Sequence, residues 1–329
     1  MWRSVCCAVQ GTGHKRDQIP CQDKTLSLEK NGVFVIALAD GAGSARLSHY
    51  GAERVVKTAS EYIADHFLEL LNSDDGREVK KTLVDTLQTN LADEANIREC
   101  NILDLSSTLL LVAVRDKHFI LTHIGDGVIG YLDGGELKVA STPDNGEFTN
   151  VTTFVTSKDA LASMRLFKGE LKEKDAFVLM SDGTEQSLYH KPSKSLASVV
   201  KKLMHRTCLI DGQVMKTQLE DAFTSVISRN TQDDCSIAIL ARPSKNLCQV
   251  NELAFWEKLD LYTISEKNSH PKRSVSRYDS ILAITDAPCS LNQIGKALHL
   301  KPKHCKKYAD KLVTMGLLKK NRGLYQKAK

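Results

Sequence analysis

Five aspartates in this chain stand where carboxylates could converge on a cation. Asp40, Asp126, Asp182 and Asp233 lie at the ends of apolar segments typical of β-strands, and Asp23 precedes a shorter alternating segment. Hard divalent cations prefer oxygen ligands, and strand ends hold a carboxylate rigidly. A single Asp-Gly pair is most often only a turn, but the whole set predicts a cation site assembled from distant parts of the chain.

The strands and helices that must position these carboxylates follow from the spacing of apolar residues. Strand patterns occur at 4–10, 24–28, 33–40, 107–115, 118–124, 127–132, 136–140, 176–181 and 236–241. Helical spacing occurs at 49–71, 79–97, 196–208 and 214–228. Because the links between successive strands are short, antiparallel hairpins are favoured, and the whole pattern indicates an α+β fold of two sheets flanked by helices.

The composition is that of an ordinary soluble globular protein, with 42% hydrophobic and 26% charged residues. No apolar run approaches the roughly 20 residues needed to span a bilayer, and the first residues turn polar too soon for a secretion signal. The nine cysteines are irregularly spaced and form no C-x-x-C pair, which indicates reduced thiols. We therefore expect a cytoplasmic protein with no membrane partner.

Charge divides the chain into an acidic-leaning body and a basic tail. From Arg242 onward there are 18 Lys and Arg against 7 Asp and Glu, whereas the rest of the chain has 27 against 33. The pattern predicts three parts: a large domain at 1–242, a linker with a short helix at 243–276, and a small domain at 277–329. Helices are expected in this small domain at 278–285, 291–298 and 301–315, followed by a hairpin at 317–325.

In order and spacing, the acidic motifs resemble those of the metal-dependent protein phosphatases of type 2C. The resemblance covers residues 1–242 and rests on Gln22-Asp23, Asp40-Gly41, Gly125-Asp126-Gly127, Ser181-Asp182-Gly183 and Asp233-Asp234-Cys235-Ser236. Gly11-Thr12-Gly13-His14 and Pro20-Cys21-Gln22-Asp23 narrow it to a bacterial branch. The resemblance implies a four-layer α/β-β/α sandwich of two antiparallel sheets flanked by helices.

The same resemblance implies an enzyme that hydrolyses phosphoserine and phosphothreonine in proteins. Two Mn²⁺ or Mg²⁺ ions would hold a bridging hydroxide. The hydroxide would attack phosphorus, and the ions would stabilise the charge of the transition state. Asp40 would bridge the two ions, Asp182 and Asp233 would hold one of them, and the Gly41 carbonyl would help to hold the other. Asp23 would contact the site directly or through water. Asp40 and Asp182 would thereby be catalytic.

Two further aspartates have outlying roles by the same resemblance. Asp126 would sit at the rim of the site, near a third and weaker ion. Asp234 falls where the family often has asparagine, so we expect it behind the metal ligands rather than among them.

The chain departs from the family pattern at two positions. Many members carry a histidine after the second Asp-Gly, where this chain has Ala42, and an arginine where it has Gln18. Arg16, Lys15 or His14 could take over the binding of phosphate, and the guanidinium of Arg16 matches phosphate geometry best. His14 could serve as the general acid or as a phosphate donor. The alternative for His14 is a turn histidine that bonds its own backbone.

The small C-terminal domain resembles a winged helix, with a third helix that is rich in lysine. Lys303, Lys307 and Lys311 recur at four-residue spacing on one face of this helix, and Lys306 lies beside them. Such a face suits the phosphates of DNA. The alternative is a solvated lysine face of a module that binds a protein partner.

Two other functions remain open on the sequence. The chain could be a DNA-binding regulator whose phosphatase-like domain is catalytically weak or inactive, since Ala42 and Gln18 depart from the family pattern. The tail could also dock a cognate Ser/Thr kinase or a phosphorylated protein substrate.

Overall fold

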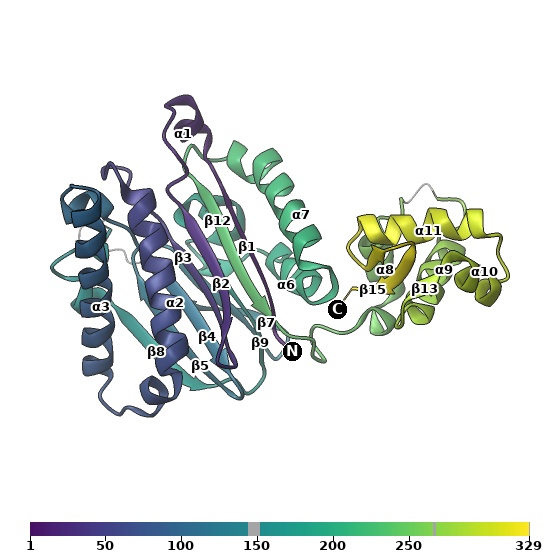
Figure 1. Ribbon diagram of the computed structural model, residues 1–329, viewed down its shortest axis with the longest axis horizontal. Coiled ribbons are helices and arrows are strands. Elements are labelled where there is room, and N and C mark those ends of the chain that lie inside the picture. The colour runs from purple at the N-terminus through teal and green to yellow at the C-terminus, as the bar shows by residue number, and fades with distance from the viewer. Residues whose placement is uncertain (144–151, 266–267, 329) are drawn as a thin grey trace. The chain divides into compact units, whose positions relative to one another are not determined.

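The computed structural model describes residues 1–143, 152–265 and 268–328 and divides into two compact units (Figure 1). Unit 1 comprises Met1–Met204 and Leu219–Arg242, and unit 2 comprises His205–Gln218 and Pro243–Lys329. The break between units falls inside two helices, α6 (Val199–Leu209) and α7 (Gly212–Ser225), which each contribute to both.

Unit 1 is built on two five-stranded sheets in which every described pairing is antiparallel. The first has the order β1-β12-β9-β6-β7, and its strands are Arg3–Val9, Cys235–Ala241, Lys174–Met180, Val128–Asp133 and Glu136–Ser141. The second has the order β2-β3-β4-β5-β8, and its strands are Lys24–Lys30, Val33–Ala39, Leu109–Arg115, His118–Ile124 and Arg165–Glu170. The predicted pairing of the second and third strands is confirmed by the β2–β3 register.

Alternation along β3 explains how the layers pack. Ile36 and Leu38 point into the core between the two sheets, together with Leu110 and Phe177. The residues between them, such as Ala37, belong to a second core beneath the helices. Because side chains alternate between the faces of a strand, one apolar segment serves both cores.

Helices cover the outer faces of the two sheets. Helices α2 (Ser48–Asn72) and α3 (Gly76–Ile97) pack together over the second sheet. The parts of α6 and α7 that belong to unit 1, residues 199–204 and 219–225, are drawn on the side of the first sheet away from α2 and α3 (Figure 1). The predicted α/β-β/α sandwich is thereby confirmed. Short elements connect the layers: α1 (Thr12–Arg16), η1 (Ile102–Leu105), α4 (Ala160–Ser163), η2 (Asp182–Thr184), α5 (Glu185–Leu188), β10 (Tyr189–His190), β11 (Ser195–Leu196) and η3 (Ile227–Arg229).

Unit 2 contains several helices and a small antiparallel sheet of order β13-β15-β14. Its elements are η4 (Val250–Glu252), α8 (Phe255–Leu261), α9 (Pro271–Ile284), β13 (Cys289–Ser290), α10 (Leu291–Leu298), α11 (Pro302–Thr314), β14 (Leu318–Asn321) and β15 (Leu324–Lys327). As the sequence predicts, Ser290 caps α10 by accepting a hydrogen bond from the Gln293 N–H.

One boundary in the tail differs from the prediction. Helix α9 begins at Pro271, inside the segment predicted as linker, and Lys267 lies outside the described residues. Proline is favoured in the first turn of a helix, and Val275 and Tyr278 are buried one turn apart. The buried pair shows that this stretch packs as a helix, although its many polar residues suggest a linker.

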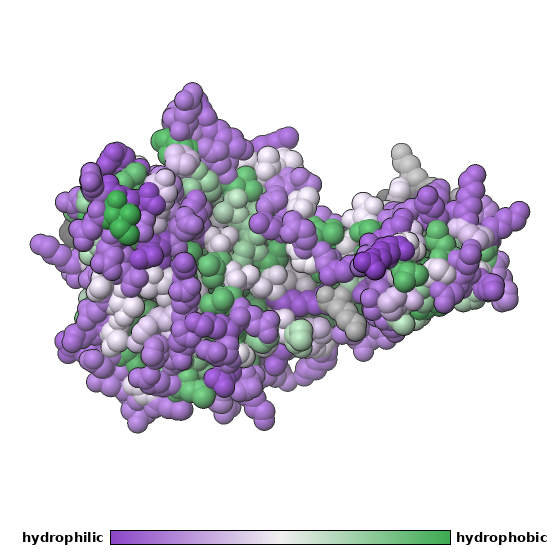
Figure 2. Space-filling view, in the orientation of Figure 1, coloured by the Kyte–Doolittle hydropathy of each residue, from purple (hydrophilic) through white to green (hydrophobic). Residues whose placement is uncertain are grey.

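No helix among residues 1–143, 152–265 and 268–328 is long and apolar enough to cross a membrane. Hydrophilic residues cover most of the face seen in Figure 2, and hydrophobic ones occur there in small groups.

Candidate active site

A cavity of about 560 Å³ in unit 1 brings four of the predicted aspartates together. Asp40, Asp126, Asp182 and Asp233 all line it, and His14 lines it as well. The two sheets supply these side chains: Asp40 follows β3 of the second sheet, whereas Asp182 follows β9 and Asp233 precedes β12 in the first. The carboxylates that the sequence places far apart therefore meet where the ends of the two sheets adjoin.

Backbone hydrogen bonds fix the turn that carries Asp40. The Asp40 N–H donates to Thr108 Oγ1 at 2.8 Å, and the Thr108 N–H donates to the Asp40 carbonyl at 2.8 Å. Gly41 then pairs with Ser107 in an isolated antiparallel bridge. Asp40 and Gly41 thus sit on a rigid support that joins the end of β3 to the start of β4.

Burial and mutual repulsion make these carboxylates hard to ionise together. Burial raises the pKa of Asp40 well above its ordinary value, and the charges of Asp23, Asp182 and Asp233 raise it further. Burial also raises the pKa of Asp182 to about 6 and that of Asp23 to about 7, with neighbouring carboxylates contributing to both. Partial burial raises the pKa of Asp233, although its side chain stays open to solvent. Each group thus feels the negative charge of at least two neighbouring carboxylates.

Asp23 lies behind the cavity rather than on its wall. Its side chain is 1% exposed, and neither carboxylate oxygen has a hydrogen-bond partner among the described residues. Oδ1 of Asp182 also lacks one. Buried carboxylate oxygens without partners are costly, and a cation would satisfy them.

The donor set fits divalent cations in kind. Its members are carboxylates, which suit Mg²⁺ and Mn²⁺. Within the described ranges, no three His, Cys, Asp or Glu side chains form a ready-made group that could hold a metal ion. The carboxylates nevertheless act on one another, since the charges of Asp23, Asp182 and Asp233 raise the pKa of Asp40. The residues therefore match a cation site in chemistry and in their unsatisfied oxygens, but they do not form a closed coordination shell.

Asp126 occupies a more open position than Asp23. It lies in the turn between β5 and β6, and Thr152 Oγ1 donates a hydrogen bond of 2.5 Å to its Oδ2. This hydrogen bond connects the Asp126 carboxylate to the segment that contains Thr152 and Phe154.

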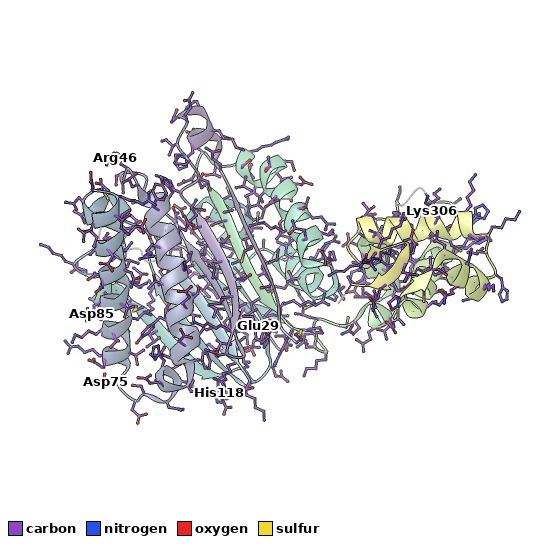
Figure 3. The ribbon with its side chains drawn as sticks, viewed as in Figure 1. Glu29, Arg46, Asp75, Asp85, His118 and Lys306 are labelled. Carbon is purple, nitrogen blue, oxygen red and sulfur yellow. The ribbon has the colours of Figure 1, made fainter. Side chains whose placement is uncertain are left out.

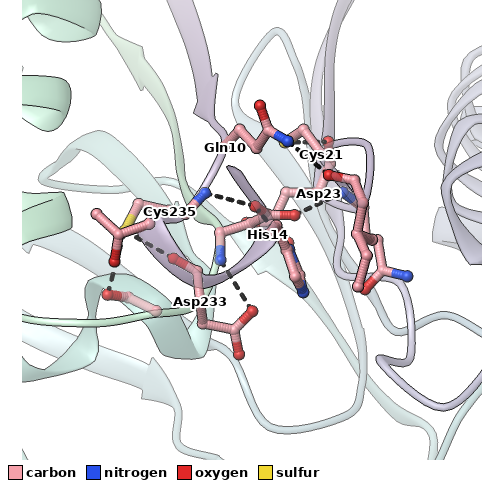
Figure 4. Close-up of polar contacts among 12 residues, drawn as sticks. Gln10, His14, Cys21, Asp23, Asp233 and Cys235 are labelled. Atoms are coloured by element: carbon pink, nitrogen blue, oxygen red, sulfur yellow. Dashed lines mark hydrogen bonds and ion pairs between the residues drawn. The ribbon is translucent and has the colours of Figure 1, made fainter. Parts of the chain in front are cut away.

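His14 is held by the residue next to Asp233. Its Nδ1 lies 2.9 Å from Oδ1 of Asp234, at the distance of an ion pair but without the alignment of a hydrogen bond. Asp234 is 1% exposed and accepts hydrogen bonds from the N–H groups of Gly11 at 2.7 Å and Gln22 at 2.5 Å. The polar contacts around His14 and Asp233 are drawn in Figure 4. Both carboxylate oxygens of Asp234 therefore accept hydrogen bonds from backbone N–H groups. Nδ1 of His14 faces Asp234 rather than the backbone of its own turn.

Arg16 also lines the cavity, but its guanidinium has a partner. Its Nε and Nη2 donate to the two carboxylate oxygens of Asp17 at 2.7 and 2.9 Å. Both residues are exposed. To bind phosphate, Arg16 must exchange this surface pair for the ligand, and such pairs are weak.

Lys191 is a cation whose charge interacts with Asp182 and Asp126, and no sequence pattern predicts it. Lys191 Nζ lies 2.5 Å from Oε2 of Glu185, a buried residue in α5. The hydrogen bond with Glu185 raises the pKa of Lys191, and the charges of Asp182 and Asp126 add to the effect. No motif surrounds Lys191, so only the fold reveals that it belongs to this electrostatic neighbourhood.

The four lysines singled out in the tail do not share one face. Lys303, Lys306 and Lys307 are exposed on α11, whereas Lys311 is partly buried. Its Nζ donates to the Thr263 carbonyl at 3.5 Å and lies 5.5 Å from the centre of the Tyr278 ring. The expectation that Lys311 extends the cationic face is therefore wrong, because this side chain packs within unit 2.

Comparison with known proteins identifies the family to which residues 10–224 are similar. A family model described as protein phosphatase 2C matches residues 10–224. The serine/threonine-protein phosphatase 3 of Escherichia coli strain K12 is 29% identical over 173 residues, which cover 50% of this chain and 67% of that protein.

Solved structures show the same fold in distant relatives. A bacterial serine phosphatase gives a TM-score of 0.52 at 14% identity, covering 73% of this chain and 98% of that one. The serine/threonine phosphatase Stp1 from Staphylococcus aureus gives 0.50 at 14% identity, covering 74% and 96%. Because the family model spans well over half of the residues, the chain belongs to the protein phosphatase 2C family and is a serine/threonine protein phosphatase of that type.

Proposed function

We propose that this phosphatase removes phosphate from phosphoserine and phosphothreonine in proteins with the help of two Mn²⁺ or Mg²⁺ ions. The observation that carries the proposal is the cluster of Asp23, Asp40, Asp182 and Asp233. These four come from separate segments, and burial raises the pKa of each. Negative charge adds to the effect: that of Asp23, Asp182 and Asp233 acts on Asp40, and that of Asp126 and Asp234 acts on Asp233. Uncompensated repulsion of this kind is what bound cations relieve.

The residues that would hold the ions follow from their positions. Asp40, Asp182 and Asp233 present carboxylates to the cavity, and Gly41 adds its main-chain carbonyl beside Asp40. Asp23 would complete the set from the buried side, directly or through water. When bound, the ions would supply positive charge for the phosphate and lower the pKa of a water molecule.

Asp126 would serve a third and weaker ion. Its more open position at the cavity wall and its hydrogen bond from Thr152 support this outlying role. Thr152 thereby orients the Asp126 carboxylate.

The chain's own groups would handle the proton and the phosphate charge. With Nδ1 of His14 turned toward Asp234, its Nε2 is the ring nitrogen left for the cavity. There it would donate a proton to the serine or threonine oxygen as the phosphate bond breaks. Arg16, after exchanging Asp17 for phosphate, would bind the non-bridging oxygens.

The reaction calls for a phosphorylated protein as the partner, and a cognate Ser/Thr kinase would produce that substrate. The alternative of an inactive, sensing domain is not favoured, because the full carboxylate set is retained around one cavity.

The direct test is phosphate release from a phosphothreonine peptide with Mn²⁺, with Mg²⁺ and with a chelator. The wild-type protein should release phosphate only with a divalent cation. Asp182→Asn should lower kcat at least 1,000-fold, on the order expected when an essential catalytic group is removed. The control is Asp85→Asn, an exposed carboxylate on α3 (Figure 3), which should leave kcat unchanged. Release that is equal with the chelator, or unaltered in Asp182→Asn, would reject the proposal.

A further inference from the structure

Unit 2 carries exposed cationic side chains that take no part in the proposed hydrolysis of phosphate. We propose that the N-terminal half of α11, together with the tip of the β14–β15 hairpin, binds the backbone of duplex DNA. Lys303, Lys306 and Lys307 on α11 and Arg322 at the hairpin tip form this surface, which we call the α11 face.

Charge balance in the tail leaves this face without internal compensation. Residues 268–329 contain 14 Lys and Arg against three Asp. All three carboxylates are already engaged inside unit 2. Asp279 binds Lys258 at 2.7 Å, Asp310 binds Lys320 at 3.1 Å, and Asp286 lies 3.5 Å from Lys327. Asp310 also interacts with Lys306 through its charge. The α11 face nevertheless keeps a net positive charge, because one shared carboxylate stands against four cations, and a negatively charged partner would complement it.

Helix α11 carries this charge and follows α10 after a tight turn. A short turn joins the two, with His299 in the left-handed region at φ 51°. At Gly295 a Cβ would lie 2.8 Å from the Leu300 carbonyl oxygen, so glycine lets the turn fold closely against α10. Two helices joined in this way form a helix–turn–helix pair, in which the second helix can enter the major groove.

Burial along α11 separates its two faces. Cys305, Ala309 and Leu312 are fully buried and fix the helix in the core of unit 2. Lys303, Lys306 and Lys307 are exposed, and no ion pair or hydrogen bond of their side chains occurs within the described residues. Lys306 is labelled on α11 in Figure 3. A helix of about 10–12 Å diameter fits a major groove about 12 Å wide.

The hairpin beside α11 adds one more cation. Arg322 is exposed in the turn between β14 and β15 at φ 48°. Lys319 and Lys320 of the same hairpin are engaged, with Asp211 at 2.8 Å and Asp310 respectively. Arg322 is thus free to reach phosphate beyond the groove that receives α11.

The chemistry of the α11 face favours nucleic acid over an acidic protein. Protein interfaces rely on buried aromatic and aliphatic anchors, and α11 exposes no large hydrophobic side chain. The exposed ones in the described part of unit 2 are Phe255 and Trp256 on α8 and Leu324 on β15. A face made of cations alone matches the phosphate backbone, whose binding is electrostatic and independent of sequence.

The test is fluorescence anisotropy of a labelled duplex of about 30 base pairs, roughly three helical turns, titrated with the full chain. The measurement is repeated between about 50 and about 200 mM salt. The triple variant Lys303→Glu/Lys306→Glu/Lys307→Glu is compared with Lys57→Glu/Lys81→Glu/Lys117→Glu, which makes the same change in net charge at exposed lysines of unit 1. The wild-type protein should bind, with an affinity that falls linearly in log salt.

The α11 triple variant should lose about 100-fold or more in affinity, and its salt slope should fall by about 3, one for each phosphate contact removed. The unit 1 variant should bind like the wild type. Equal losses in the two variants, or an absence of salt-dependent binding by the wild type, would overturn the proposal. So would displacement by polyglutamate as effective as displacement by unlabelled DNA, because that would identify an acidic protein surface as the partner.

Both variants should keep metal-dependent phosphatase activity, which reports on their folding. The DNA result does not depend on that activity, so either proposal can fail alone. If the glutamate variant loses its cooperative melting, the triple Lys→Gln variant makes the same test with a smaller expected loss.

Discussion

Nδ1 of His14 lies 2.9 Å from Oδ1 of Asp234, and this contact joins the first turn after β1 to the loop before β12. The neighbouring residue in that loop, Asp233, faces the cavity. One short loop therefore presents a carboxylate to the cavity and, through Asp234, orients the histidine that shares the cavity wall. A histidine thus lines the cavity from the segment after β1, although position 42 carries alanine.

The first prediction concerns His14 as a proton donor. His14→Gln should lower kcat on a phosphothreonine peptide about 100-fold, within the range for loss of a general acid. It should lower kcat much less on an aryl phosphate, because a phenolate leaves without needing a proton. The measurement is kcat for both substrates under the same conditions, and the ratio of the two losses reports on proton donation.

Lys15→Gln is the matched control for this experiment, because Lys15 is the exposed neighbour of His14 in α1. It should leave both substrates unaffected. If His14→Gln slows both substrates equally, His14 acts in binding phosphate rather than in proton transfer.

The second prediction concerns Asp234 as a structural anchor. An amide in its place offers one acceptor oxygen, whereas the carboxylate accepts from both Gly11 and Gln22. Asp234→Asn should therefore lower the free energy of unfolding by about 2–4 kcal/mol, the order for disrupting a buried, charged hydrogen-bond centre. Urea unfolding measures the loss. Asp133→Asn, at a more exposed ion pair with Lys138, should cost less than about 1 kcal/mol, and similar losses in the two variants would contradict the anchoring role.

The third prediction links metal binding to pH through the carboxylate cluster. The pKa of Asp23 rises from 3.8 to about 7 and that of Asp182 to about 6. A folded-state pKa above the unfolded one means that the folded protein binds protons more tightly, so these groups favour folding at low pH. That contribution is lost as pH rises from 3.8, where the unfolded groups ionise, and the loss is complete once pH exceeds about 6 to 7. The metal-free protein should accordingly lose this part of its stability between about pH 4 and about pH 7 and change little above that.

Mn²⁺ should restore that stability at pH 8, where the cluster is ionised. At about 100 times Kd, the cation should raise Tm by about 5–10 °C, and by much less at pH 5, where protons compete. Asp182→Asn should melt higher than the wild type without metal at pH 8, since Asp182 has a pKa of about 6 and the substitution removes one repelling charge, and it should not respond to Mn²⁺. Differential scanning calorimetry measures both effects, with NaCl of equal ionic strength as the control. A shift in Tm that is the same at both pH values would contradict a metal site in this cluster.

The fourth prediction concerns His123, which is 1% exposed and accepts or donates a 2.6 Å hydrogen bond with Ser141 Oγ. Burial, aided by the charge of Arg165, lowers the pKa of His123 from 6.5 to about 3. The folded protein keeps the ring neutral, whereas the unfolded chain takes up a proton below about pH 6.5, so stability falls as pH drops below that value. Between pH 7 and pH 4.5 the wild type should lose about 2–3 kcal/mol more than His123→Gln. Parallel losses in urea unfolding would show that His123 does not titrate in this way.

The sequence predicts those elements whose local pattern agrees with their final environment. Strand β3 is apolar throughout because both of its faces are buried, and Ser290 caps α10 by contacts within one turn. Strand β8 escaped prediction because it lies at a sheet edge, where Phe167 is 45% exposed and the pattern is mixed. Helix α1 escaped because Gly11-Thr12-Gly13 is typical of a turn.

The candidate site divides in the same way. The motif aspartates could be found because each is marked by its own strand end and neighbouring residues. The position of Asp234 behind the ligands could also be predicted, but its partners could not, because Gln22 lies more than 200 residues away in the sequence. Lys191 could not be found, because only the fold brings its charge near Asp182 and Asp126. Lys311 was misassigned for a related reason: four-residue spacing places it on a helix face, but Tyr278 and the Thr263 carbonyl determine where its ammonium lies.

The last prediction tests the close contact behind Asp182. A Cβ at Gly183 would lie 1.9 Å from the carbonyl oxygen of Asp234, so any side chain there must push the two loops apart. Gly183→Ala should therefore displace Asp182 and the Asp233–Asp234 loop together, lowering kcat at least 10-fold and weakening Mn²⁺ binding measured by calorimetry. Gly76→Ala, where a Cβ meets no atom within 4 Å, should leave both quantities unchanged. Because a shift of about 1 Å in catalytic groups can cost about 100-fold in rate, wild-type kcat in Gly183→Ala would mean that the spacing of these two loops does not control the reaction.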